Sequence, residues 1–225
     1  MIPLPLVITG SSGRIGSALM EHLADLEPRG VDLAHGHDLS DVEVARQAVA
    51  GCRSLVHLAA NPDEFSEWDE LRQPNVDAVV HVLGAAAEAG VQRVVFASSV
   101  HASGDWRPGG PETPPRPGNL YGATKAFGEA VVRMHADRGD FGGVCLRIGW
   151  YRDDVAGVAG LPPEARPRAV TARDLAQLVR RALDSDVPFL IAYGVSGIDG
   201  CPYDIAEARA VLGYAPRDGR PAPGD

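Results

Sequence analysis

The chain has 225 residues, 45% of them hydrophobic and 23% charged, and its formal net charge is -9 at pH 7. This length suits one domain, with enough residues to bury a substantial core. The acidic balance argues against a nucleic-acid or anionic-membrane surface, which would need clustered Lys and Arg. A negatively charged small molecule is not excluded, because backbone amides can bind phosphate.

Cysteine usage and the first residues indicate the cellular compartment. Cys52, Cys145 and Cys201 lie far apart, without the spacing of a zinc site or a disulfide framework, so we expect neither. The N-terminus lacks the basic segment and the cleavage site of a signal peptide. No apolar run approaches the length of a membrane span. We therefore expect a cytoplasmic protein that binds neither membrane nor metal.

The first half of the chain alternates apolar runs with helical periodicity. Residues 4–9 are apolar and lead into glycines, as in a buried parallel strand. Apolar residues then recur at helical spacing over 14–26, before Gly30. The other elements expected in this half are a weak strand at 31–34, a helix at 42–50, a strand at 54–58, a helix at 76–89 and a strand at 91–97.

The second half continues the alternation after a long loop. Residues 104–118 are rich in Pro and Gly, and their position favours an active-site flap over a linker. We expect helices at 120–136, 171–183 and 203–212, and strands at 143–148 and 189–193. This order predicts an α/β fold, a Rossmann-like doubly wound parallel sheet. Residues 1–150 would form the dinucleotide-binding core and 151–225 a small substrate-binding segment packed on it.

A glycine-rich turn joins the first strand to the first helix. Gly10, Gly13 and Gly16 are spaced GxxGxxG, a variant of the dinucleotide fingerprint. The first glycine lets the chain turn, the second lets backbone approach a pyrophosphate, and the third lets helix and sheet pack closely. The helix N-terminus then faces the anion. We expect a dinucleotide cofactor here, with Arg14 and Ile15 among its contacts.

Dinucleotide folds place an acidic residue about 20 residues beyond the glycines to bind the ribose hydroxyls. Asp32, Asp38 and Asp41 are all available in a compressed stretch of this chain, and each could equally be a solvated turn residue. No Arg directly follows the expected strand end to favour a 2′-phosphate. We therefore expect NAD rather than NADP.

Tyr121 and Lys125 are four residues apart, so a helix places them on one face. They follow a serine pair, Ser98-Ser99, at the end of an apolar run. Phenol is a poor base at neutral pH, with a reference pKa of about 10, and a nearby ammonium lowers that pKa. The set predicts proton transfer to or from a substrate hydroxyl or carbonyl. An ordinary surface Tyr and Lys is the alternative.

Taken together, these residues resemble the extended short-chain dehydrogenase/reductase superfamily. The similarity covers nearly the whole chain, through Thr9-Gly-x-x-Gly-x-x-Gly16, Asp38-Leu39, His57-Leu58-Ala59-Ala60, Asn75, Ser98-Ser99, Tyr121-x-x-x-Lys125, Leu146-Arg147-Ile148, Arg173-Asp174-Leu175-Ala176 and Leu212-Gly213-Tyr214-x-Pro216. The resemblance implies that Asp38 and Leu39 lie near the adenine. Leu58, Ala59 and Ala60 would pass the ribose and phosphates.

The same resemblance implies roles at the reacting end of the cofactor. Lys125 would bind the nicotinamide ribose and lower the pKa of Tyr121, while Ser99 would polarise the reacting oxygen. Asn75 would brace its helix and hold a water in the proton relay. Because homodimers are common in this family, through the helices that begin near residues 76 and 120, we also expect a homodimer.

Within the superfamily the chain is most similar to the uronate dehydrogenases. The segments that carry this similarity are Phe96-Ala-Ser-Ser-Val-His-Ala-Ser-Gly104, Arg116-Pro-Gly-Asn-Leu-Tyr-Gly122, Lys125-Ala-Phe-Gly-Glu129 and Arg147-Ile-Gly149. Those enzymes oxidise C1 of a sugar acid with NAD, which places His101 beside the substrate. Pro62 and Trp150 depart from the small hydroxylated residues of that group. Trp150 would reject a sugar acid or stack on its ring.

A uronate also needs a cation for its carboxylate. The candidates are Arg152, Arg166 and Arg168, and Arg166 is preferred because it lies shortly before the helix expected at 171–183. Each of the three could instead be a surface charge.

The resulting hypothesis is an NAD-dependent oxidoreductase that transfers a hydride to or from a small hydroxylated, sugar-like substrate, with Tyr121 as general base and acid. A sugar epimerase or dehydratase is the first alternative, although only 75 residues follow Trp150 to wrap a nucleotide diphosphate. A non-catalytic dinucleotide sensor is the second. The intact Ser, Tyr and Lys set argues against that sensor, because binding alone needs no proton relay.

Overall fold

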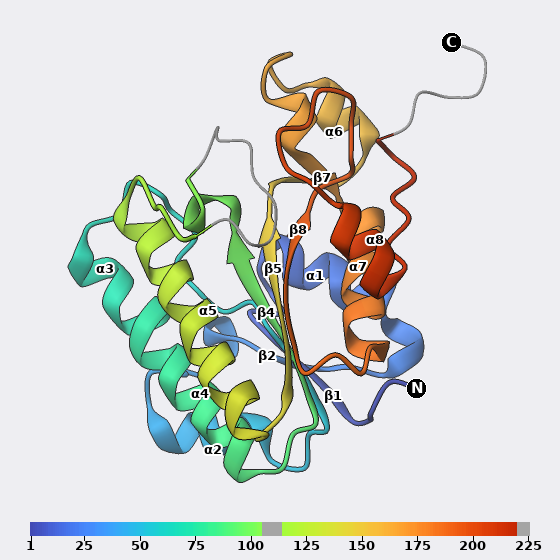
Figure 1. Ribbon diagram of the computed structural model, residues 1–225. Coiled ribbons are helices and arrows are strands. Elements are labelled where there is room, and N and C mark those ends of the chain that lie inside the picture. Colours follow the sequence, from blue (N-terminus) through green and yellow to red (C-terminus); the bar gives the residue numbers. More distant parts are fainter. Residues whose placement is uncertain (105–113, 220–225) are drawn as a thin grey trace.

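A parallel sheet of six strands forms the centre of the computed structural model, which describes residues 1–104 and 114–219. The strands lie in the order β2-β1-β3-β4-β5-β8 (Figure 1). They are β1 (Leu6–Thr9), β2 (Arg29–Val31), β3 (Ser54–His57), β4 (Arg93–Ser99), β5 (Gly142–Ile148) and β8 (Phe189–Gly194). All neighbours pair in parallel, and β1, β3 and β4 are buried throughout, as a sheet covered on both faces requires.

Helices cover both faces of this sheet (Figure 1). One layer contains α2 (Val42–Val49), α4 (Ala78–Glu88) and α5 (Leu120–Arg138), and the other α1 (Arg14–His22), α7 (Ala172–Asp184) and α8 (Ala206–Leu212). The alternation of side chains along β1 shows the two cores: Leu6 and Ile8 belong to one apolar cluster, Val7 to the other. The doubly wound α/β fold expected from the sequence is confirmed.

The strand order reverses beside β1, which lies between β2 and β3. Such a reversal opens a crevice at the carboxyl ends of the strands, where α/β proteins bind ligands. Among the described residues, only the short β2 lies beyond β1, whereas the six-strand Rossmann order 3-2-1-4-5-6 places two strands there. The stretch between α1 and α2 is short and contains one strand of three residues, β2, which explains why the sheet ends there.

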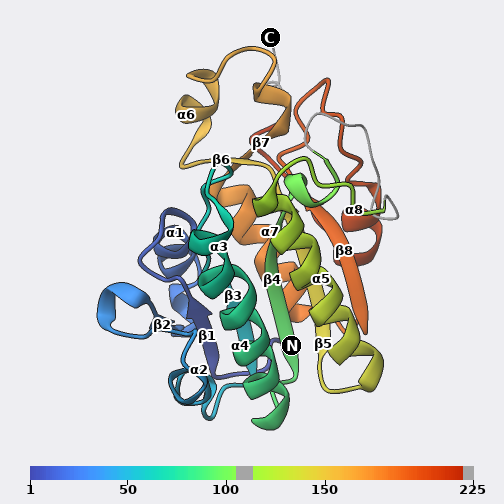
Figure 2. The same cartoon turned by 90° about the vertical axis from the view of Figure 1, so that its left-hand side faces the viewer.

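A smaller part stands at the carboxyl end of the sheet (Figure 2). It comprises β6 (Trp150–Arg152) and β7 (Ala169–Thr171), which pair with each other, and α6 (Val155–Ala159). The chain then returns to the core through α7 and β8, so residues 151–225 also supply one strand of the main sheet. The division into a core and a substrate-binding segment at residue 150 stays a prediction.

Several elements differ from the expected ones for local reasons. The helix expected at 76–89 is preceded by α3 (Trp68–Arg72), capped by Glu67 and Glu70, and by a π-helical turn over Gln73–Asp77. Pro74 lies in that turn and has no N–H to donate, which accommodates the wider winding. Of the expected loop, residues 105–113 lie outside the described residues. No helix of the described ranges is long and apolar enough to span a membrane.

Candidate functional site

A cavity of about 900 Å³ lies at the crevice where the strand order reverses. Its walls come from the turn after β1, the ends of β3 and β4, and the start of α5. Every residue expected to bind the cofactor lines it: Gly10, Gly13, Arg14, Ile15, Gly16, Asp38, Leu39, Leu58, Ala59, Ala60, Tyr121 and Lys125. Segments far apart in sequence therefore converge on one cavity.

The glycine-rich turn is shaped so that side chains would not fit. Gly10 has a φ of +69°, and a Cβ there would lie 2.8 Å from the backbone nitrogen of Ala59. A Cβ on Gly16 would lie 2.0 Å from the carbonyl oxygen of Gly10. Gly13 caps the start of α1 without a side chain, so the first N–H groups of the helix remain available to an anion. The turn therefore fits a dinucleotide pyrophosphate.

A buried hydrogen-bond set ties β1 to β3 beneath this turn. The Thr9 Oγ1 atom accepts from the backbone N–H groups of Leu58 and Ala59, at 3.2 Å and 3.4 Å. Its own proton therefore points to Nδ1 of His57, 2.8 Å away. Burial lowers the pKa of His57 to about 3, with a further contribution from Lys125, so the imidazole stays neutral.

The structure separates the three candidate acidic residues. Asp32 follows β2 and lines the cavity, and its carboxylate accepts from the backbone N–H of Ser12 in the glycine-rich turn at 2.8 Å. Asp38 also lines the cavity, but its carboxylate accepts from the N–H and hydroxyl of Ser40. Asp41 caps α2. Asp32 therefore has the position that dinucleotide folds give to their ribose-binding acid.

The reacting end of the cavity brings together Ser99, Tyr121 and Lys125. Ser99 ends β4, and the other two lie one turn apart on α5. Lys125 is 6% exposed, and its ammonium donates to the carbonyl oxygen of Ala97 at 2.9 Å and lies 5.7 Å from the centre of the Tyr121 ring. The three side chains can serve a hydroxyl or carbonyl placed beside them.

The pKa of Tyr121 is raised, which is opposite to the direction expected from the sequence. Burial raises the pKa of Tyr121, a hydrogen bond with Ser99 opposes this, and the Glu64 carboxylate raises it further. Burial also lowers the pKa of Lys125 to about 8. Both groups occupy one poorly solvated pocket, where the loss of water disfavours the charged form of each.

Asn75 braces two segments and does not line the cavity. Its side chain accepts from the N–H of Asn61 at 2.7 Å and donates to the carbonyl oxygen of Asn61 at 3.0 Å. It also donates to the hydroxyl of Thr124 on α5 at 3.2 Å. These bonds hold the loop after β3 against α5, the helix that carries Tyr121 and Lys125. The water-holding role implied by the family resemblance stays a prediction.

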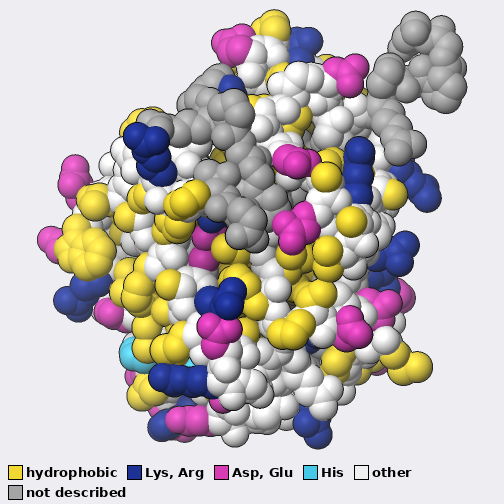
Figure 3. Space-filling model, in the orientation of Figure 1, with side chains coloured by type: hydrophobic (Ala, Val, Ile, Leu, Met, Phe, Trp, Pro, Cys, Tyr) yellow, Lys and Arg dark blue, Asp and Glu magenta, His cyan; other side chains and the backbone are white. Residues whose placement is uncertain are grey.

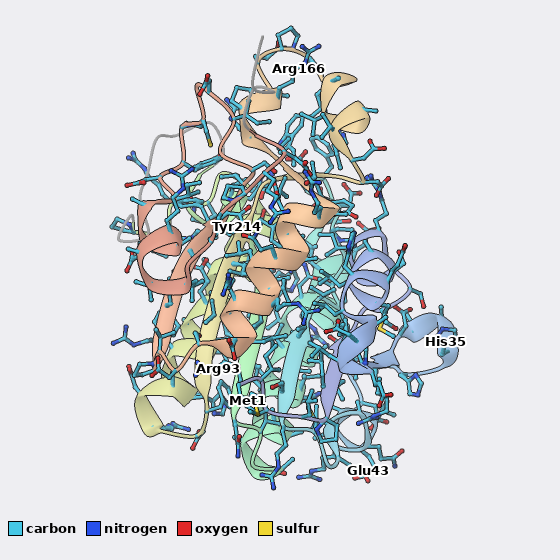
Figure 4. The ribbon with its side chains drawn as sticks, turned by 90° about the vertical axis from the view of Figure 1, so that its right-hand side faces the viewer. Met1, His35, Glu43, Arg93, Arg166 and Tyr214 are labelled. Carbon is cyan, nitrogen blue, oxygen red and sulfur yellow. The ribbon has the colours of Figure 1, made fainter. Side chains whose placement is uncertain are left out.

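The expected substrate residues separate into two groups. His101 packs edge-on against Tyr121, with 5.7 Å between ring centroids, so it lies at the reacting end. Trp150 packs on the apolar cluster of the smaller part, and Arg166 is exposed and donates to the carbonyl of Leu161 (Figure 4). None of His101, Trp150 and Arg166 is among the described residues that line the cavity, but the ring of His101 contacts that of Tyr121, which does line it. The expected substrate contacts of Trp150 and Arg166 lack support in this geometry.

Three further residues lie at the site without a signal in the sequence. Tyr151 lines the cavity, and its buried hydroxyl has no hydrogen-bond partner within the described residues. Glu64 and Asn119 do not line the cavity but contact His101, which packs on Tyr121. Asn119 caps the start of α5, and Asn at a helix start is a general capping signal that does not by itself indicate a contact with His101. The loop that carries Glu64 has no periodicity that predicts its position.

The glycine-rich turn at the reversal of a doubly wound sheet, joined to a Ser-Tyr-Lys set, defines a dinucleotide-dependent oxidoreductase of the short-chain dehydrogenase/reductase type. The model of the NAD dependent epimerase/dehydratase family matches residues 6–188. The chain belongs to this family. The expected fold, enzyme class and cofactor, NAD, are thereby confirmed.

Named relatives act on different sugars. The chain is 32% identical to the NAD-dependent glucose-6-phosphate dehydrogenase of Haloferax volcanii, over 95% of this chain and 93% of that protein. It is 30% identical to the L-arabinose 1-dehydrogenase of the same organism, over 95% and 96%. A mutant uronate dehydrogenase from Agrobacterium tumefaciens complexed with NAD superimposes with a TM-score of 0.83, at 25% identity, over 98% and 92%.

Proposed function

We propose that this protein oxidises the C1 hydroxyl of a small cyclic sugar or sugar acid with NAD, giving a lactone. The observation that carries the proposal is that Ser99, Tyr121 and Lys125 line the same cavity as the glycine-rich turn. A proton-transfer set and a dinucleotide site thus open onto one space of about 900 Å³. Relatives named as 1-dehydrogenase and uronate dehydrogenase support chemistry at C1.

In the oxidative direction the Tyr121 phenolate takes the proton of the C1 hydroxyl. The Ser99 hydroxyl donates a hydrogen bond to the same oxygen as the carbonyl forms. Lys125 stabilises the ionised form of Tyr121 whenever its ammonium is protonated. Bound NAD supplies the acceptor for the hydride that leaves C1. The substrate thus loses one hydride and one proton, and Tyr121 returns its proton to water between turnovers.

The direct test is NADH formation by the purified protein with a panel of sugars. We expect steady formation of NADH, followed by its absorbance, with at least one member of a panel of galactose, glucose, arabinose, galacturonate, glucuronate and glucose 6-phosphate. Interconversion of nucleotide sugars without net NADH would indicate the epimerase instead, because epimerases return the hydride. Cofactor binding without any turnover would favour a sensor.

The position of Asp32 leads to a prediction about the cofactor. A carboxylate beside the ribose accepts its hydroxyls and repels a 2′-phosphate. We expect Asp32→Ser to weaken NAD binding and to move the NAD-to-NADP preference toward NADP by about tenfold or more. Dissociation constants for both cofactors, measured by calorimetry, check this. Asp38→Asn is the matched control, and an equal shift in that variant would assign the ribose to Asp38.

We further propose that the protein is a cytoplasmic homodimer that works on a small molecule and not on nucleic acid. Hydrophobic side chains gather over α3, α4 and α5 on the face shown in Figure 3. Val80 on α4 and Phe127 and Met134 on α5 are 45%, 38% and 39% exposed, and a second copy of the chain would cover them.

A further inference from the structure

A carboxylate stands beside the proposed acid-base group. The Oε2 atom of Glu64, on the loop between β3 and α3, lies 3.4 Å from Nε2 of His101. The ring of His101 in turn contacts the ring of Tyr121. Neither Glu64 nor His101 is among the described residues that line the cavity, but the charge of Glu64 reaches Tyr121, whose pKa it raises. A sugar whose C1 oxygen reaches the Tyr121 hydroxyl is therefore exposed to the same charge.

The hydrogen bonds of His101 indicate which ring nitrogen donates to Glu64. The Asn119 Oδ1 atom accepts from the N–H of Gly122 at 2.8 Å, so the amide NH₂ of Asn119 faces Nδ1 of His101 at 3.2 Å. Nδ1 is therefore an acceptor, and Nε2 carries the proton that points to Glu64. This arrangement satisfies both contacts. The negative charge of Glu64 also raises the pKa of Tyr121.

Cations are scarce in the described part of the cavity wall. Arg14 and Lys125 are the cationic side chains among its described lining residues. Arg14 belongs to the glycine-rich turn and pairs with Asp153 at 3.6 Å, while Lys125 donates to Ala97 beneath Tyr121. Arg166 lies at the far end of the smaller part (Figure 4). A negative group on the sugar would thus meet Glu64 without a matching described cation in the wall.

We propose that Glu64, held by His101, is a specificity-determining residue that makes the site select neutral aldoses over uronates and sugar phosphates. The inference rests on the proposed function. A carboxylate accepts hydrogen bonds from sugar hydroxyls and repels a like charge on the substrate. Glu64 therefore acts in two directions, attracting a neutral polyol and excluding an anionic one.

The test compares sugars that share ring stereochemistry and differ in charge at C6. Galactose is paired with galacturonate, and glucose with glucuronate. We expect the wild-type kcat/KM to favour each neutral sugar by about tenfold or more, because one uncompensated like charge at short range has at least this effect. Glu64→Gln should reduce that ratio by about tenfold, mainly through a lower KM for the uronates.

Asp69→Asn is the matched control, because it removes one negative charge from an exposed position on the neighbouring helix α3. It should keep the wild-type ratio. A wild-type enzyme that prefers the uronates, or equal ratios in both variants and the wild type, would overturn the proposal.

Equilibrium binding separates this inference from the proposed function. The 1-deoxy analogues of galactose and galacturonate lack the reacting hydroxyl, so their dissociation constants in the presence of NADH report charge selection without turnover. We expect the neutral analogue to bind more tightly in the wild type, and the difference to shrink in Glu64→Gln. The absence of NADH formation with every sugar would contradict the proposed function, while tighter binding of the anionic analogue would contradict the role of Glu64.

Discussion

Replacement of Tyr121 by Phe is expected to lower kcat for sugar oxidation by about a hundredfold or more, because it removes the group that takes the substrate proton. The ring that packs against His101 is retained, so the fold and the affinity for NAD should change little. Single-turnover measurement of NADH formation, together with calorimetric titration of NAD, distinguishes a loss of chemistry from a loss of binding.

Tyr151→Phe is the matched control for this substitution. Tyr151 also lines the cavity, but its hydroxyl is buried and has no hydrogen-bond partner within the described residues, so its removal should change kcat only a few-fold. A hundredfold loss in both variants would show that the chemistry does not depend on Tyr121 in particular.

The raised pKa of Tyr121 also sets the sign of the pH dependence. Oxidation needs the phenolate, so its rate should rise with pH through the neutral and alkaline range. Reduction of the lactone needs the protonated phenol and should fall over the same range. Initial rates in both directions across pH check this. A rate of oxidation that falls as pH rises would show that another group is the base.

The second large effect concerns the stability of the fold at the buried pair of Glu129 and Arg147. Their side chains are 3% and 1% exposed. Both carboxylate oxygens of Glu129 accept from Arg147, at 2.8 Å and 2.9 Å, and one also accepts from the hydroxyl of Ser98 at 2.6 Å. We expect Glu129→Gln to lower the free energy of unfolding by about 3–5 kcal/mol, because it leaves a buried guanidinium without its counter-charge.

Urea unfolding at neutral pH measures this effect. A double variant, Glu129→Leu with Arg147→Met, should recover most of the lost stability, since no uncompensated charge then remains. Asp137→Asn breaks the exposed pair of Arg133 and Asp137, and should have a far smaller effect. A Glu129→Gln variant as stable as Asp137→Asn would mean that water reaches the guanidinium.

Much of the fold and part of the site follow from short stretches of sequence. Alternating apolar runs and helical periodicity predicted the layers, because burial on both sides of a parallel sheet demands uniform apolar strands. The spacing of Gly10, Gly13 and Gly16 predicted the turn, since backbone geometry there leaves no room for a Cβ. Tyr121 and Lys125 share a helix, so their proximity depends only on the helical repeat.

Tertiary structure decided what depends on packing between distant segments. It placed Asp32 against the glycine-rich turn by pairing β2 with β1, and it left Arg166 outside the described residues that line the cavity. It also reversed the expected direction of the Tyr121 pKa. That pKa depends on burial and on neighbours such as Glu64, and no local sequence pattern predicts that Glu64 lies near Tyr121. The sequence alone thus determined the proposed acid-base chemistry and its cofactor. The proposed selection by charge depends on the position of Glu64, which lies on a loop whose sequence has no periodicity to predict its place in the fold.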